Sequence, residues 1–77
     1  MRMKFIEMTG QTLVDVVHPD EIDEQELRAA GVADDTIVRI NQQGDIEIRR
    51  PEGWDVLGGL IGDFEQRIKS RTGLEWA

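Results

Sequence analysis

The segment Thr36–Arg50 most constrains the fold, because it predicts a β-hairpin with a defined register. Two runs of strand-forming residues flank a turn at 41–45, whose glycine suits a type I turn closed by a left-handed residue and a G1 bulge. The predicted cross-strand pairs are Val38 with Ile48, Arg39 with Glu47, and Ile40 with Ile46. This register places two apolar pairs on one face and an opposite-charge pair on the other, an arrangement that stabilises sheets.

Residues 3–17 predict another hairpin, which precedes the central one. Thr9-Gly10-Gln11 suits a turn, and Thr12–Val17 is rich in strand-forming residues. Both faces of this hairpin would be partly apolar, so we expect it to lie centrally or to be covered on two sides. His18-Pro19 ends the strand, because proline restricts the preceding residue and cannot donate to a ladder.

The acidic run Asp20–Glu26 has two interpretations. As a helix start, it offers Asp23 as N-cap with Glu26 completing a capping box, and Ile22 with Leu27 as a hydrophobic staple. As a calcium or magnesium loop, it lacks the alternating oxygen ligands and central glycine of an EF-hand. We therefore expect a short helix over 24–30, closed by a left-handed glycine at 31, and no metal site.

A second helix is predicted over Val56–Arg71, after a turn at 51–54 and with Asp55 as its cap. Its apolar residues recur at helical spacing, and Gly73 suits a C-cap. Three glycines in its first two turns would each cost about 1 kcal/mol relative to alanine. Gly58 and Gly62 would share a face, which permits close packing either on the chain's own sheet or on a partner; the third interpretation is a flexible segment that orders only on binding. The predicted partner-binding residues are Trp54, Leu57, Gly58, Leu60, Gly62, Phe64 and Trp76.

Composition limits the classes of function. The 77 residues contain no cysteine and one histidine, so disulfides and thiolate metal sites are absent. A chain this small gains stability from association, so a homo-oligomer is one expectation. The net charge of −7 argues against general attraction to nucleic acid or anionic lipid, although it leaves room for a local basic patch. No apolar run approaches the ~20 residues of a membrane span, and the N-terminus has no signal-peptide pattern, so the expected location is cytoplasmic.

Catalytic chemistry has little support in the sequence. His18 has no recognisable nucleophile or second ligand near it, and Ser70 lies between Lys69 and Arg71 with no base in sight. The glycine-rich segment 57–62 lacks the spacing and the lysine of a phosphate-binding loop. We expect no enzyme activity, catalytic residue or cofactor. Three arginines of the central hairpin, Arg39, Arg49 and Arg50, could hold phosphate. Two of them have acidic neighbours in the strands, however, and Arg39 with Glu47 is typical of an ordinary surface ion pair, which we favour.

Two family resemblances arise from short motifs. Thr9-Gly10-Gln11-Thr12 with Val17-His18-Pro19 resembles the first hairpin of ubiquitin, and Gly31-Val32 and Gly44 follow in the order of a β-grasp domain. The resemblance covers at most about 50 residues. The chain has no terminal Gly-Gly, so conjugation is not implied.

The second resemblance is to AbrB-like swapped-hairpin proteins, which include DNA-binding antitoxins. It is carried by Pro19, Leu27, Gly31-Val32, Asp35, Ile37 and the run Gly44–Pro51. It implies an intertwined dimer, DNA contact through Arg2 and Lys4, and a toxin-binding segment within 54–76. The spacing from Gly10 to Pro19 is longer than in that family, which weakens the transfer of the two basic residues.

The sequence thus predicts one α+β domain over 1–77, in the order ββαββα. A four-stranded, mainly antiparallel sheet with a short helix would occupy 1–50, and a C-terminal amphipathic helix and tail would occupy 51–77 and pack on the sheet. The expected function is a non-enzymatic, acidic protein–protein interaction module, an adaptor or regulator that could self-associate through its C-terminal helix. The alternative is an AbrB-like DNA-binding antitoxin or transcription regulator.

Overall fold

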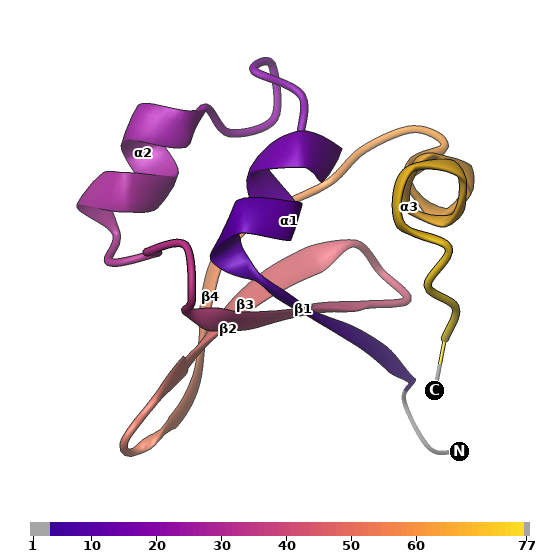
Figure 1. Ribbon diagram of the computed structural model, residues 1–77. Helices are drawn as coiled ribbons and strands as arrows, with labels where there is room; N and C mark the ends of the chain where they lie inside the picture. The colour runs from indigo at the N-terminus through magenta and orange to yellow at the C-terminus, as the bar shows by residue number, and fades with distance from the viewer. Residues whose placement is uncertain (1–3, 77) are drawn as a thin grey trace.

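The computed structural model describes residues 4–76, which form one four-stranded antiparallel sheet and three helices (Figure 1). In chain order the elements are β1 (Phe5–Thr9), α1 (Gly10–Val16), α2 (Glu24–Ala29), β2 (Ile37–Asn41), β3 (Asp45–Arg50), β4 (Gly53–Gly59) and α3 (Phe64–Thr72). Neighbouring strands pair in the order β1-β2-β3-β4. The predicted α+β class, the four-stranded sheet and the C-terminal helix are confirmed, whereas two segments adopt a different secondary structure from the predicted one.

The central hairpin has the predicted register. Val38 pairs with Ile48, Arg39 with Glu47, and Ile40 with Ile46. The turn is held by Asn41, whose Oδ1 accepts hydrogen bonds from the backbone N–H groups of residues 43 and 45 at 2.9 and 3.0 Å. Gly44 has a φ of +91°, as expected for the left-handed position that closes the turn.

The prediction of a strand over Thr12–Val17 is wrong, because the chain leaves β1 directly into α1. Thr9 caps this helix, its Oγ1 accepting from the N–H of Thr12 at 3.3 Å. The helical spacing brings Leu13, Val16 and Val17 onto one buried stripe, whereas a strand would have divided them between two faces. Tertiary burial therefore overrides the strand preference of the valines.

Helix α2 begins and ends as its capping residues predict. Asp23 Oδ1 accepts from the N–H of Glu26 at 2.8 Å, and Ile22 and Leu27 are both buried in the core. Gly31 follows with a φ of +100°. The acidic run is therefore a helix start in the structure.

The predicted helix over Val56–Arg71 is wrong in its first half. The turn is shorter than expected, and the segment from Gly53 to Gly59 pairs with β3 as strand β4. Helix α3 begins only at Phe64 and ends before Gly73, whose φ of +74° makes it the predicted left-handed C-cap. A strand avoids the helix penalty of two adjacent glycines and gains a ladder of backbone hydrogen bonds.

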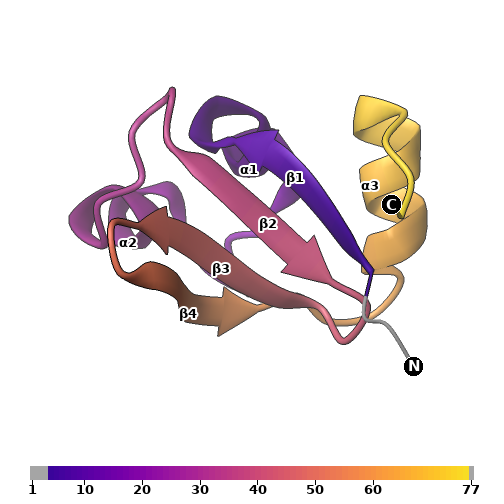
Figure 2. The same cartoon turned by 90° about the horizontal axis from the view of Figure 1, so that it is seen from below.

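The helices cover one face of the sheet only. Figure 1 shows α1, α2 and α3 above the sheet, and Figure 2 shows the four strands from below with α1 and α2 behind them. The core between these layers is formed by fourteen buried side chains, which are Ile6, Met8, Leu13, Val16, Val17, Ile22, Leu27, Val32, Val38, Ile40, Ile46, Ile48, Leu60 and Ile68. Among residues 4–76, no helix crosses the opposite face, which we call the open face.

Candidate functional site

The structure does not bring the seven predicted partner-binding residues onto one helix. Three of them lie in β4, two in the connection to α3, one at the start of α3 and one in the C-terminal tail. Leu60 is buried, and Leu57, Phe64 and Trp76 are partly buried against the core, so none of these four forms an exposed stripe. The seven residues therefore do not form one helical stripe, and self-association through the C-terminal helix stays a prediction.

The two glycines do not permit a helix–helix approach either. A Cβ added at Gly58 would have the Ile22 side chain 3.8 Å away, within the chain's own fold. At Gly62, whose φ is +71°, an added Cβ would have no atom within 4 Å. Gly58 belongs to a sheet strand, and Gly62 turns the chain between β4 and α3.

A row of side chains on the open face includes one from every strand. The guanidinium carbon of Arg39 on β2 lies 3.8 Å from the ring centre of Phe5 on β1 and 4.1 Å from that of Trp54 on β4. Glu47 on β3 accepts a hydrogen bond from Arg39 Nη2 at 3.1 Å. We call these four residues the open-face row.

The open-face row is more buried than an ordinary surface ion pair. The side chains of Arg39 and Glu47 are 21% and 11% exposed, because the aromatic rings cover the guanidinium. Arg39 Nε is buried and has no hydrogen-bond partner among residues 4–76. Burial of an unpaired N–H group costs free energy, and the stacking of Arg39 on two rings offsets part of that cost, since desolvated cation–π contacts contribute up to about 2 kcal/mol.

An exposed apolar side chain continues the open face at β4. Val56 is 64% exposed and opposes Glu47 across the β3–β4 ladder. It lies two residues after Trp54 and so on the same face of the strand, and Trp54 is itself only partly buried. The sequence-based prediction named Trp54 but missed Val56 and Phe5, because it placed residue 56 in a helix and did not pair β1 with β2.

The three arginines of the central hairpin do not share a phosphate-binding face. Arg39 is occupied by Glu47 and two rings, whereas Arg49 is exposed. Arg50 lies on the helix-covered side, where it donates to the carbonyl of Ala30 at 3.2 Å and pairs with Asp55. The three arginines therefore do not form a common phosphate-binding site, and the expected Arg39–Glu47 pair is present. Of the two residues that the AbrB resemblance indicated, Arg2 lies outside the described residues.

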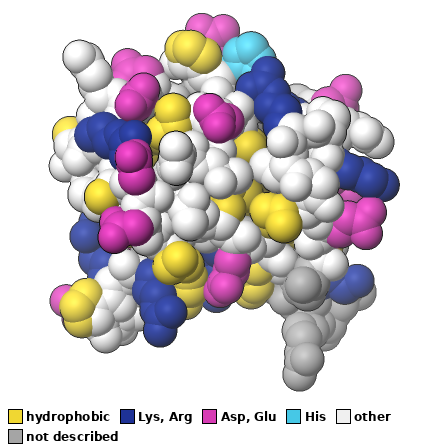
Figure 3. All heavy atoms as spheres, viewed as in Figure 1, with side chains coloured by type: hydrophobic (Ala, Val, Ile, Leu, Met, Phe, Trp, Pro, Cys, Tyr) yellow, Lys and Arg dark blue, Asp and Glu magenta, His cyan; other side chains and the backbone are white. Residues whose placement is uncertain are grey.

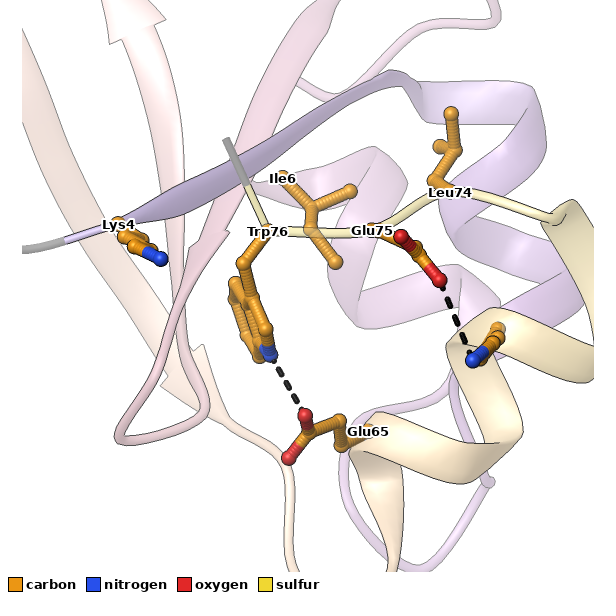
Figure 4. Close-up of a pocket in the computed structure, with 7 residues that line it drawn as sticks. Lys4, Ile6, Glu65, Leu74, Glu75 and Trp76 are labelled. Atoms are coloured by element: carbon orange, nitrogen blue, oxygen red, sulfur yellow. Dashed lines mark hydrogen bonds and ion pairs between the residues drawn. The ribbon is translucent and has the colours of Figure 1, made fainter.

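The C-terminal tail docks on its own chain. Trp76 Nε1 donates to Glu65 Oε1 at 2.9 Å, and Lys69 Nζ lies 3.2 Å from Glu75 Oε1. Figure 4 shows these pairs around a hollow of about 240 Å³, with Lys4 and Ile6 of the first strand region beside them. Trp76 is thus half-buried and packs against the core of its own chain.

A buried ion pair ties α3 to the loop after α1. Glu21 accepts from Arg67 Nη1 at 2.6 Å and Nη2 at 2.8 Å, and also from the N–H groups of His18 and Ile61. The Glu21 side chain is 2% exposed. The hydrogen bonds from Arg67 lower the pKa of Glu21 from 4.5 to about 2, and the same pairing raises the pKa of Arg67. Each oxygen of the Glu21 carboxylate accepts two hydrogen bonds from the protein itself, so the pair holds α3 against the loop after α1.

Charged side chains elsewhere are dispersed. Figure 3 shows acidic and basic groups interspersed over this side of the molecule, with hydrophobic groups in small separate areas. No cluster of three histidine or carboxylate side chains that could hold a metal ion occurs within residues 4–76. The described part of the chain also contains no helix with the length and apolar character needed to cross a membrane.

Comparison with known proteins leaves the site to be interpreted from its own geometry. No family model, no curated protein and no solved structure matches this chain.

Proposed function

We propose that this chain is a non-enzymatic, cytoplasmic protein–protein interaction module whose partner binds the open face beside β4. One observation carries the proposal: Trp54 is stacked on Arg39 and partly exposed next to Val56, on a face that no described helix covers. Tryptophan and arginine are the residue types most enriched at interface hot spots.

The geometry supports a protein partner because the open-face row is already ordered. Trp54 and Arg39 hold each other in place, so binding immobilises few additional side-chain rotamers. Val56 adds exposed apolar area that a partner could bury at about 25 cal/mol per Å². A rigid aromatic group with an adjacent apolar patch suits a protein surface.

Charge on the open face favours protein over nucleic acid. Arg39 is neutralised by Glu47, and among residues 4–76 the strands of this face also carry Glu7 and Asp45 as well as the exposed Arg49. Binding to phosphate backbones depends on Lys and Arg that displace counterions, and an arginine already paired with a carboxylate contributes little.

The experiment is affinity capture from lysate of the source cells with tagged full-length protein, Trp54→Ala and Asp23→Ala. The Trp54 variant loses the ring on Arg39 and is expected to unfold about 1–2 kcal/mol more readily. Asp23→Ala loses a helix cap far from the open face, at about 1 kcal/mol, and so is a control matched for stability.

The proposal predicts a protein that binds stoichiometrically to the wild type and to Asp23→Ala but is lost with Trp54→Ala. Equal capture by all three would refute the assigned surface. Recovery of nuclease-sensitive DNA in place of protein would support the AbrB-like alternative and refute the proposal.

A further inference from the structure

We propose, as a deepening of the proposed function on which it rests, that the partner adds an extended segment to the free edge of β4. The segment would be a fifth strand with apolar side chains toward the open face and a basic side chain beside Glu52. The proposal concerns the regular part of β4, the four residues from Gly53 to Val56.

No strand among residues 4–76 pairs with the outer edge of β4. β4 pairs with β3 on one side and ends the sheet. Within residues 4–76, no hydrogen bond joins the backbone of Gly53–Gly59 to any group outside the sheet. An edge strand leaves alternate N–H and C=O groups unpaired, and these are the groups that an added strand binds.

The opposite edge of the sheet differs. β1 is followed directly by α1, and the C-terminal tail lies beside its start, where Lys4 and Ile6 share a hollow with Leu74 and Trp76 (Figure 4). β4 lacks this cover and contains no lysine or proline; of the features that protect natural edges it has a bulge, which lies beyond Val56, and the charged side chain of Asp55. β4 therefore lacks the neighbouring tail that lies beside the start of β1.

An irregularity limits the length of the added strand. Val56 pairs with Glu47 and Gly58 with Ile46, so Leu57 is an extra residue at a bulge. Bulges disrupt the ladder locally and bend the strand. We therefore expect the partner to form its backbone hydrogen bonds with residues 53–56.

The side chains of β4 specify the chemistry of the partner. Trp54 and Val56 point to the open face and suit apolar neighbours, whereas Asp55 points to the other face with its side chain 60% exposed. Glu52, Gly53, Trp54 and Asp55 also line a shallow hollow of about 240 Å³ at the start of the strand. Glu52 is exposed and has no ion pair among residues 4–76, whereas Asp55 shares its carboxylate with Arg50; a lysine or arginine side chain therefore fits best beside Glu52 at this end of the strand.

The acidic charge of the chain also favours a segment of another protein over a second copy of this chain as the occupant of the β4 edge. Pairing β4 with its own copy would join two chains of net charge −7 and bring two copies of Asp55 near each other. Like charges across a ladder are destabilising. A basic, extended segment of another protein avoids this repulsion.

The test uses a capped peptide, acetyl-Lys-Val-Lys-Thr-Lys-Val-Lys-amide, titrated into the ¹⁵N-labelled full chain and followed by amide chemical shifts. An analogue N-methylated on alternate residues keeps the charge of the peptide but removes the backbone N–H donors along the peptide edge that would face β4. We expect shifts concentrated at 53–56, and binding weakened roughly five- to tenfold for each hydrogen bond that N-methylation removes.

Two protein variants provide a matched pair. Val56→Lys and Ile61→Lys make the same charge change at exposed aliphatic residues, 64% and 67% exposed, but only the first lies in β4. We expect Val56→Lys to weaken binding about tenfold or more, since an edge lysine blocks strand addition, and Ile61→Lys to change it by less than about threefold.

Several results would overturn strand addition. Equal binding of the N-methylated peptide, equal effects of the two lysine variants, or shifts that map away from β4 would each do so. Concentration-dependent shifts in β4 without peptide would replace the basic segment by a second copy. If the peptide fails while capture still depends on Trp54, only the strand-addition mode is wrong. If capture is also indifferent to Trp54, the proposed function itself is wrong.

Discussion

Replacement of Glu21 by glutamine should remove one of the largest single contributions to the stability of this fold. Glu21 is 2% exposed and Arg67 12% exposed, so the substitution leaves a guanidinium with little solvent and no carboxylate. Arg67 also donates to the carbonyls of Val16 and Ile61, at 3.0 and 3.2 Å, and these contacts hold the charge in place. Glu21→Gln therefore tests whether the pair joins α3 to the rest of the core.

Two arguments give the same magnitude. The pKa of Glu21 falls from 4.5 to about 2 on folding, which at about 1.4 kcal/mol per pH unit corresponds to roughly 3 kcal/mol. Removal of one partner from a buried ion pair costs about 3–5 kcal/mol in other proteins. Small domains have a total stability of only about 5–15 kcal/mol, so the variant should be near the limit of folding.

The pH dependence gives the sharper test. Because the folded pKa lies below the unfolded value, the contribution of Glu21 is fully present above about pH 5 and is lost as the pH falls from 4.5 toward about 2. The wild type should lose about 3 kcal/mol over this range, and Glu21→Gln should lose much less. The two proteins should converge in stability near pH 2.

The assay is urea unfolding followed by circular dichroism at pH 7, 5, 3.5 and 2.5. Glu24→Gln is the control, because Glu24 pairs with Arg28 on the surface with its side chain 60% exposed and should contribute less than about 1 kcal/mol. A Glu21 variant that unfolds with the same pH slope as the wild type would refute the assigned role. So would equal losses for the two variants at pH 7.

Two further predictions concern the backbone and the open face. Gly44→Ala should destabilise by about 2 kcal/mol or more, because its φ is +91° and the new Cβ would lie 2.8 Å from the Leu60 carbonyl oxygen; Gly62→Ala, with no atom nearby, should cost about 1 kcal/mol. Thermal melts of the pair measure the difference, and equal losses would contradict the close approach. In a Trp76→Phe background, Arg39→Leu should shift Trp54 fluorescence by removing its stacked cation, and an unchanged spectrum would argue against the contact.

The parts of the fold that could be predicted are those fixed by neighbouring residues. The register of β2 and β3 follows from alternation and from a short turn, and both are local patterns. Helix α2 follows from a cap at Asp23 and a glycine at 31. In each case the residues that determine the structure lie within about fifteen positions of one another.

The parts that could not be predicted depend on distant contacts. At Gly10 the chain enters α1 with its N–H bonded to the Thr36 carbonyl at 2.8 Å, and a Cβ there would lie 2.0 Å from the Ala33 carbonyl oxygen. That close approach lets the chain turn back across the sheet as a helix, and no local pattern indicates it. In the segment from Val56 onward two local patterns conflict: Gly58, Gly59 and Gly62 disfavour a helix, whereas the spacing of the apolar residues predicts one.

The candidate site could not be predicted for the same reason, namely that the segment of β4 was predicted to be a turn and a helix. Arg39 and Glu47 could be paired from the sequence, but the rings that cover them come from β1 and β4, whose places in the sheet were not predicted. With residue 54 in a turn before a helix, Trp54 has no reason to lie over Arg39. Correct placement of β4 would have predicted both the open-face row and the exposed Val56.

The arrangement of layers explains why both proposals concern β4. Three helices of seven, six and nine residues cover one face of the sheet, so the side chains of the other face must satisfy one another. The open-face row does this from β1 to β4 by placing an ion pair between two aromatic rings. Beyond β4, the described part of the chain has no further strand to cover Val56 or to pair with the backbone of β4. The exposed apolar side chain and the unpaired edge therefore occur together, which is the combination that an added strand would bury.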